Sequence, residues 1–296
     1  MRGRQFTQSG VMNAYRSGRR KYGLRKDGYY TWNSKRYVSV STVLELLAKP
    51  ALVNWAAWSV ANYIKEQFFR KERGDITGVA LAQIICDASG NAKIPWELSD
   101  LAKDIGSAIH KVVEKFGLDG KEPTSIHPVI RPHVDSAMKL IKESGMQIQM
   151  VECSVISEKH GYGGTLDAIS LIQVEEEPKL FLMDWKKGKD AYREQALQLA
   201  AYRHADFIAI NYDDVVPGFE VPKTWRKTAD GLEIPMPQVD GSLVALLDPS
   251  GPRLVEWDTT DETFEAFLNL LALWRWTDTK PKAKLWLDGR GLDTGK

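Results

Sequence analysis

An acid and a lysine near the middle of the chain form a pattern that suits phosphodiester chemistry. Asp184 and Lys186 end a segment whose apolar residues 180–183 indicate a β-strand. Alternate side chains of a strand point to the same face, so the carboxylate and the ammonium are expected together, with Trp185 on the other face. A carboxylate binds Mg²⁺ or Mn²⁺ through oxygen, and an ammonium stabilises charge that develops on phosphorus. The alternative is a strand-end ion pair of little energetic value.

A second carboxylate is needed, because one carboxylate alone binds Mg²⁺ weakly, and Asp167 is the natural candidate. It lies in the predicted strand 165–174, which a short loop joins to the predicted strand 179–186. Pairing of these strands as a hairpin would bring Asp167 near Asp184. Asp167 also stands between apolar residues, where an unpaired acid would cost free energy. These two acids and the lysine therefore predict a metal site.

Three polar residues on predicted helices are candidates to complete the site. His110 follows Gly106 by about one helical turn and can ligate a metal, although a histidine on a helix is more often structural. Gln198 and Tyr202 are four residues apart in a predicted helix over 192–210 and share one of its faces. They can contact a DNA phosphate or order the lysine; ordinary packing is the alternative.

The elements that must position these residues form an α/β (α+β) pattern. A hairpin is expected over 29–38, a turn at 161–164 and a loose tail over 288–296. The predicted helices cover 43–47, 52–64, 80–86, 95–113, 127–142, 192–210 and 259–276, and the predicted strands 147–157, 165–174, 179–186, 215–221 and 243–247. The central order is helix, three strands, helix, strand, which predicts a core with a mixed sheet flanked by helices.

Composition narrows the class of protein. The 296 residues carry a net charge of +1, and the basic residues crowd the start of the chain, where they contact phosphates or form a solvated arm. Two cysteines supply neither a disulfide framework nor the four thiolates of an iron–sulfur cluster. No apolar run is long enough for a membrane span, and we expect a cytoplasmic protein. The expected organisation is a basic flexible arm, an N-terminal hairpin and helical annex, a core with a C-terminal helix, and a tail: 1–28, 29–100, 101–285 and 286–296.

Taken together, the motifs resemble those of the PD-(D/E)XK nuclease superfamily, and within it the RecB-like, phage-type exonucleases. The resemblance covers about residues 100–210. It departs from the family pattern at Leu166, which replaces the proline of the first motif, and at Asp184, which replaces the commoner glutamate. The matching residues, in chain order, are Gly106 and His110, Glu152, Gly164-Thr165-Leu166-Asp167, Asp184-Trp185-Lys186, and Gln198 with Tyr202.

The resemblance implies a restriction-endonuclease-like core and a role for each residue. His110, Asp167, Asp184 and the backbone carbonyl of Trp185 would bind Mg²⁺ or Mn²⁺, with Lys186 as the catalytic lysine. Gln198 and Tyr202 would form the motif that follows it, and Glu152 would support the site, binding metal through water.

The implied activity is that of a metal-dependent DNA exonuclease in phage recombination or replication, in the cytoplasm of a bacterial host. The implied partners are DNA and a phage recombinase or single-strand annealing protein, without a membrane, and an oligomer is compatible with the superfamily. Two alternatives are an endonuclease on the same fold and a DNA-binding protein with a degenerate site. Trp32 and Trp225 are candidates to stack on unpaired bases.

Overall fold

The structure is a computed structural model that describes residues 25–47, 105–113, 115–116, 125–214, 220–279, 285–287 and 290–292. The predicted helices at 52–64 and 80–86, and most of the predicted strand 215–221, lie outside these residues. The strands are β1 Arg25–Lys26, β2 Tyr29–Trp32, β3 Lys35–Ser39, β4 Gln147–Ser157, β5 Tyr162–Val174, β6 Glu177–Lys186, β7 Phe207–Asn211, β8 Arg226–Lys227, β9 Gly231–Pro235, β10 Gly241–Leu246, β11 Arg253–Trp257, β12 Leu285–Leu287 and β13 Arg290–Leu292. The helices are α2 Val40–Leu44, α6 Arg131–Glu143, α7 Arg193–Arg203, α8 Asp261–Asp278 and the 3₁₀ turn η1 Tyr212–Asp214, together with helical residues 105–113 and 115–116.

One large mixed sheet forms the centre of the described fold. β5 pairs antiparallel with β4 and β6, while β10 runs parallel to β6 and β3 runs parallel to β5. The sheet continues from β4 through β7 and β9 to β8, and from β10 to β11. The prediction of a mixed sheet flanked by helices is therefore confirmed. β2 and β3 belong to the segment expected as an N-terminal annex, and β1 lies at the end of the segment expected as a flexible arm, but all three are strands of this same sheet.

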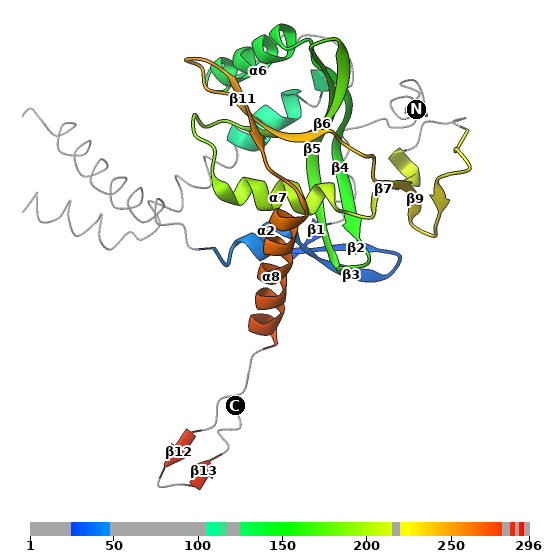
Figure 1. Ribbon diagram of the computed structural model, residues 1–296, viewed down its shortest axis with the longest axis vertical. Helices are drawn as coiled ribbons and strands as arrows, with labels where there is room; N and C mark the ends of the chain where they lie inside the picture. The colour runs from blue at the N-terminus through cyan, green and yellow to red at the C-terminus, as the bar shows by residue number, and fades with distance from the viewer. Residues whose placement is uncertain are drawn as a thin grey trace, which may run out of the picture.

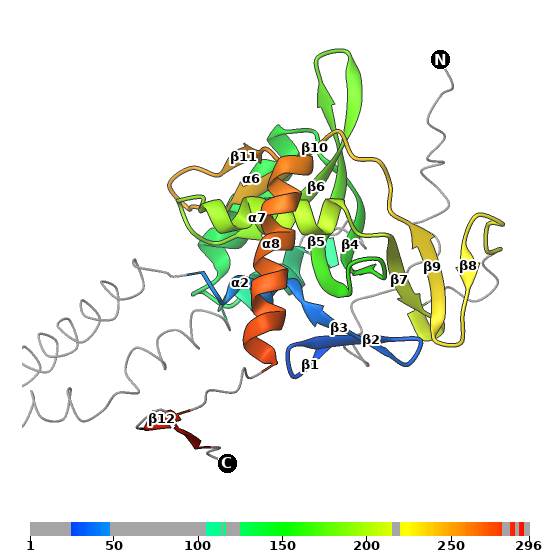
Figure 2. The same cartoon turned by 60° about the horizontal axis from the view of Figure 1, so that its bottom comes forward.

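Helices cover both faces of the sheet (Figures 1 and 2). Side chains along β6 alternate strictly between the two faces of the sheet. Leu180 and Leu182 pack in the cluster that includes residues of α2, α7 and α8, whereas Phe181, Met183 and Trp185 pack in the cluster that includes Ile109 and residues of α6. Asp184 and Lys186 continue the first series, so they point toward the α7 side.

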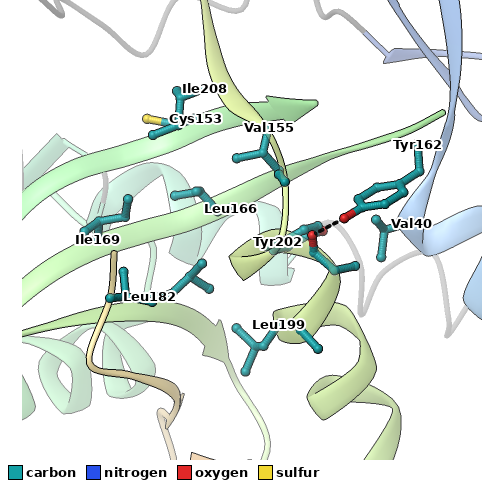
Figure 3. Packing of buried hydrophobic residues seen from close by; sticks show 14 of the residues in the cluster. Val40, Cys153, Val155, Tyr162, Leu166, Ile169, Leu182, Leu199, Tyr202 and Ile208 are labelled. Carbon is teal, nitrogen blue, oxygen red and sulfur yellow. Dashed lines mark hydrogen bonds between the residues drawn. The ribbon is translucent and has the colours of Figure 1, made fainter. Parts of the chain in front are cut away.

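The core on the α7 side holds the middle of β5 against α7 (Figure 3). Leu166, Leu182 and Leu199 are fully buried there. The buried Tyr162 hydroxyl donates a hydrogen bond of 2.8 Å to the carbonyl oxygen of Ala201, which ties the start of β5 to the C-terminal part of α7. α7 is thereby fixed over the strands that carry Asp167 and Asp184.

Two predicted boundaries in this region were wrong. The helix predicted over 192–210 ends at Arg203, because Phe207, Ile208 and Ile210 form β7 and are buried between β4 and β9. The turn predicted at 161–164 is shorter, since β5 begins at Tyr162. Periodicity alone did not separate the helix from the strand that follows it. In the segment predicted as a loose tail, residues 290–292 pair with β12.

The edge of β5 that faces away from β4 pairs with two different strands of the described chain, and a gap at residues 164–167 separates them. This gap, here called the fork, lies beside the site. β3 pairs with Tyr162 and Gly163, and β6 pairs with the segment from Ala168 to Val174. Between them, residues 164–167 have no strand partner on that edge within the described part of the chain. Pairing with β4 holds these residues on the other edge, and on the open edge the described contacts to Thr165 and Asp167 include side-chain hydrogen bonds to Tyr30 and to the N–H of Trp185. None of the described helices is long and apolar enough to cross a membrane.

Candidate metal centre

Three side chains from three elements converge at the fork. His110 comes from the helical residues 105–113, Glu152 from β4 and Asp167 from β5. One ligand atom of each residue lies within 4.8 Å of those of the other two. His110 Nδ1 is 3.5 Å from Glu152 Oε1 and 3.5 Å from Asp167 Oδ1. The His110 side chain is 26% exposed and those of Glu152 and Asp167 only 9% and 11%, so the group meets solvent mainly at the imidazole.

Glu152 has an unusual backbone for a residue within a strand. Its φ is +49°, in the left-handed region that side chains other than glycine and asparagine rarely adopt. The neighbours show the consequence: Val151 joins the cluster on the α6 side, but Cys153 joins the one on the α7 side, although residues two apart normally share a face. Strain of this kind persists where the surrounding structure enforces it, and it clusters at functional sites. Here it brings a carboxylate toward His110.

Backbone groups of Trp185 complete the geometry around His110 and Asp167. The N–H of Trp185 donates to Asp167 Oδ2 at 2.7 Å, so β6 leaves the ladder of β5 immediately after the Ala168–Met183 pair. The carbonyl oxygen of Trp185 lies 2.9 Å from His110 Nε2. The two carboxylates therefore face Nδ1 of the imidazole, whereas the Trp185 carbonyl accepts a hydrogen bond from Nε2 on the other side of the ring.

Asp184 is paired with the lysine instead of joining the three-residue group. Lys186 Nζ donates a hydrogen bond of 2.7 Å to Asp184 Oδ1 and lies 2.6 Å from Oδ2. Both oxygens of Asp184 thus contact the Lys186 ammonium, and Oδ2 has no other donor among the described residues. Asp184 is buried, with 2% of its surface exposed, so its charge is balanced in the interior mainly by Lys186.

The pKa shifts reveal an excess of negative charge. Burial opposes a charged imidazole, but Asp167 and Glu152 outweigh it and raise the pKa of His110 to about 11. Burial also opposes a charged Asp167, but His110, Lys186 and the N–H of Trp185 lower its pKa to about 2. Burial, reinforced by the charge of Asp167, raises the pKa of Asp184 to about 6 despite Lys186. Three acids share two cations within the described part of the site.

Gln198 and Tyr202 lie behind the acids on α7. Gln198 Nε2 donates to the Tyr202 hydroxyl at 3.0 Å. Burial raises the pKa of Tyr202 far above its ordinary value, and the charges of Asp184 and Asp167 add to this rise, so the phenol is a neighbour of both acids and stays neutral. A Cβ atom at Gly164 would lie 2.1 Å from Tyr202 Cε1, so a glycine is required there.

These residues suit a hard divalent cation. Carboxylate oxygens are ligands that Mg²⁺ and Mn²⁺ prefer, and the surplus acid favours a cation. Of the predicted ligands, the structure brings His110 and Asp167 together, adds Glu152 as a direct neighbour, places the Trp185 carbonyl at the other nitrogen of His110, and keeps Asp184 beside Lys186.

Sequence reasoning missed Tyr30, whose hydroxyl lies 2.8 Å from Thr165 Oγ1 beside the fork. No local pattern links it to β5.

The suggestion that Trp32 stacks on bases was wrong, because Trp32 is fully buried and its Nε1 donates to Glu233. Trp225 is partly buried against the core on the α7 side.

Comparison with protein-family models found no match to the chain, and comparison with curated proteins likewise found none.

Proposed function

We propose that the protein is a Mg²⁺- or Mn²⁺-dependent deoxyribonuclease with a restriction-endonuclease-like core, and that it acts as an exonuclease. The observation that carries the proposal is the convergence of His110, Glu152 and Asp167 ligand atoms within 4.8 Å, beside the Asp184–Lys186 pair. The described order of helix 105–113, β4, β5, β6, α7 and β7 agrees with the core expected from the motifs, although α6 is inserted before β4. The choice of an exonuclease rests on the sequence resemblance.

His110 Nδ1, Glu152 and Asp167 would hold the cation, with Asp184 at the edge of the site. The Trp185 carbonyl, which the resemblance gives as a further ligand, accepts a hydrogen bond from His110 Nε2 and would fix which ring nitrogen faces the cation. When bound, the cation would neutralise phosphate charge and lower the pKa of a water molecule. Binding by His110 requires loss of its proton, and the two carboxylates would then face the cation instead of the imidazolium.

Lys186 would act as a cation and hydrogen-bond donor, not as a general base. Burial alone would lower its pKa, but Asp184 and Asp167 outweigh burial and raise it. The ammonium is therefore charged at neutral pH, and it can donate to a non-bridging phosphate oxygen or to the attacking water. In the proposed hydrolysis, the water oxygen bonds to phosphorus while the bond from phosphorus to the leaving oxygen breaks. The attacking water gives up one proton to solvent, and the leaving oxygen takes up one proton from solvent.

The proposal is tested by digestion of end-labelled linear DNA, single-stranded DNA and covalently closed circular DNA with Mg²⁺, Mn²⁺ or EDTA. Cleavage of linear but not circular DNA, and none in EDTA, supports the exonuclease. Cleavage of the closed circle indicates an endonuclease, and metal-independent binding without cleavage indicates a degenerate DNA-binding protein; either result overturns the exonuclease proposal.

Site variants sharpen the assay. Asp167→Ala, Asp184→Ala and Lys186→Ala should each lower the cleavage rate by at least about a hundredfold, because each removes charge that the reaction uses. Glu158→Gln, a change at a half-exposed acid that pairs with Lys35, is the matched control and should cleave normally. Thermal unfolding of each variant shows whether it is folded. A folded variant of the three with wild-type cleavage would disprove its assignment.

A further inference from the structure

The N-terminal hairpin reaches the candidate metal centre from the side of the fork that lacks a strand. β3 pairs parallel with the start of β5, through Val38 with Tyr162 and Ser39 with Gly163. Tyr30 of β2 packs directly on β5 there, since a Cβ atom at Gly163 would lie 3.1 Å from Tyr30 Cβ and Cδ2. Tyr30 is buried, with 4% of its surface exposed. The hairpin therefore packs against the residues of β5 that precede Asp167.

A hydrogen bond joins this hairpin to the segment 164–167 of β5. The hydroxyl of Tyr30 and Thr165 Oγ1 are 2.8 Å apart, across 135 positions of sequence. Thr165 precedes Asp167 by two residues, which corresponds to about 7 Å along a strand. β4 pairs with the other edge of this segment, so the bond to Tyr30 holds it on the edge where the described chain provides no strand.

Tyr202 closes the segment from the other side. Its ring occupies the space where a side chain on Gly164 would lie, and its hydroxyl receives the Gln198 hydrogen bond. Tyr30 contributes to the rise in the pKa of Tyr202, as do Asp184 and Asp167, so the two phenols and the two acids are electrostatic neighbours. Gly163 and Gly164 have no side chains, and this allows Tyr30 of β2 and Tyr202 of α7 to pack against the same part of β5.

We propose that Tyr30 is a positioning residue for the metal centre, which acts on Asp167 through Thr165. It does not touch the metal or the substrate; it fixes the strand so that Asp167 meets His110 and Glu152. The inference rests on the proposed function and deepens it, because it makes the N-terminal hairpin part of the metal-binding unit.

The experiment is calorimetric titration of the full-length protein with MnCl₂, in wild type, Tyr30→Phe, Thr165→Val and the double variant. Each single change removes one hydroxyl of the pair and keeps the shape of the side chain. Each should weaken Mn²⁺ binding by about three- to tenfold, the range for loss of one hydrogen bond. The double variant should be no weaker than the worse single variant, because the two hydroxyls act as one unit. In the cleavage assay, kcat should fall while KM for DNA stays constant.

Tyr37→Phe is the matched control. Tyr37 is the register partner of Tyr30 in the same hairpin and is equally buried, so it reports on general loosening of the hairpin. Wild-type Mn²⁺ affinity in Tyr37→Phe, with weakened affinity in Tyr30→Phe and Thr165→Val, supports the proposal. Equal affinities in all variants, or losses that add in the double variant, overturn it while leaving the nuclease proposal intact. A wild-type protein that binds no Mn²⁺ overturns the nuclease proposal itself, and this inference with it.

Discussion

Two groups of buried acids lie on the same sheet, and they differ in how their charges are balanced. Glu233 on β9 is 3% exposed, and it accepts hydrogen bonds from Trp32 Nε1 at 2.8 Å and Asn33 Nδ2 at 3.1 Å. Arg226 donates to its other oxygen and also lies near Glu158. Each oxygen of Glu233 therefore has a donor, and its charge has a cationic partner.

The candidate metal centre lacks this balance. Glu152, Asp167 and Asp184 share Lys186 and a histidine that would have to give up its proton to bind a metal. Among the described residues, the donor at both oxygens of Asp184 is the same ammonium, that of Lys186. A buried acid with all its donors holds a fold together, whereas a surplus of acids indicates a place for a cation.

The Glu233 group has a definite structural task. β3 and β9 are separated by three strands in the sheet, yet the turn after β2 meets β9 through Trp32 and Asn33 (Figure 2). The sheet therefore curls, and Glu233 closes it. Because Tyr30 and Trp32 belong to the same strand, this closure also supports the hairpin that reaches the metal centre.

The contrast predicts opposite effects of two charge-removing changes on the free energy of unfolding without metal. Glu233→Gln should lower it by about 2 kcal/mol at pH 7, because the amide keeps one acceptor oxygen and sets its NH₂ group against the donor at the other position, that of Trp32 or of Arg226. Asp184→Asn should raise it by roughly 2 kcal/mol. The folded-state pKa of Asp184, about 6, exceeds its ordinary value, so ionisation costs stability above pH 6 and costs nothing well below pH 4, where the acid is protonated in both states.

Urea unfolding in EDTA at pH 7 and at pH 4 measures both changes. The gain from Asp184→Asn should fall below about 1 kcal/mol at pH 4, since the wild-type acid is neutral there in the folded state and about half protonated in the unfolded state. If Glu233→Gln and Asp184→Asn shift the free energy of unfolding in the same direction at pH 7, the distinction between the two groups is wrong.

A smaller effect is expected in the number of protons released when Mn²⁺ binds, and hence in the pH dependence of the Mn²⁺ affinity. His110 is protonated in the metal-free protein at pH 7.5, because its pKa is raised to about 11, and only a neutral imidazole binds a metal. Mn²⁺ binding should therefore release about one proton, and the affinity should rise by up to about tenfold per pH unit, or about 1.4 kcal/mol.

Titration with Mn²⁺ in buffers of low and high ionisation enthalpy gives the number of protons released. His204→Gln is a suitable control, because His204 also faces a carboxylate, Asp261, at 3.1 Å, but lies far along the chain from the proposed ligands. It should release the same proton as wild type. In His110→Gln, binding should be weaker and almost independent of pH; a full pH dependence there would show that another group loses the proton.

Local patterns predicted much of the fold around the site. The alternation of apolar residues gave β4 its observed bounds, and the order of strands and helices from β4 to α7 followed from period changes. The shared face of Asp184 and Lys186 followed from alternation along β6 in the same way. These features depend on neighbours in sequence, which is why they can be derived from it.

The features that sequence did not predict depend on distant partners. β7 was taken for the end of a helix, because its burial comes from β4 and β9. The hydrogen bond from Tyr30 to Thr165, and the closure by Glu233, join residues more than 100 positions apart. The left-handed backbone of Glu152 has no local signal either, since glutamate is not a residue that favours it.

The smallest predicted effect concerns the left-handed backbone of Glu152. It distinguishes the contribution of the Glu152 charge to Mn²⁺ binding from the contribution of its backbone strain to stability. Glu152→Asn and Glu152→Gln both remove the negative charge, and both should weaken Mn²⁺ binding, measured by calorimetry, by about tenfold if one acid pairing is lost. They should differ in stability, because asparagine tolerates the left-handed region at φ +49° and glutamine does not. The free energy of unfolding in EDTA should therefore be about 1 kcal/mol higher for Glu152→Asn than for Glu152→Gln. Equal stability of the two variants would show that the left-handed backbone of Glu152 stores no strain, and that the Glu152 carboxylate is held toward His110 by its contacts alone.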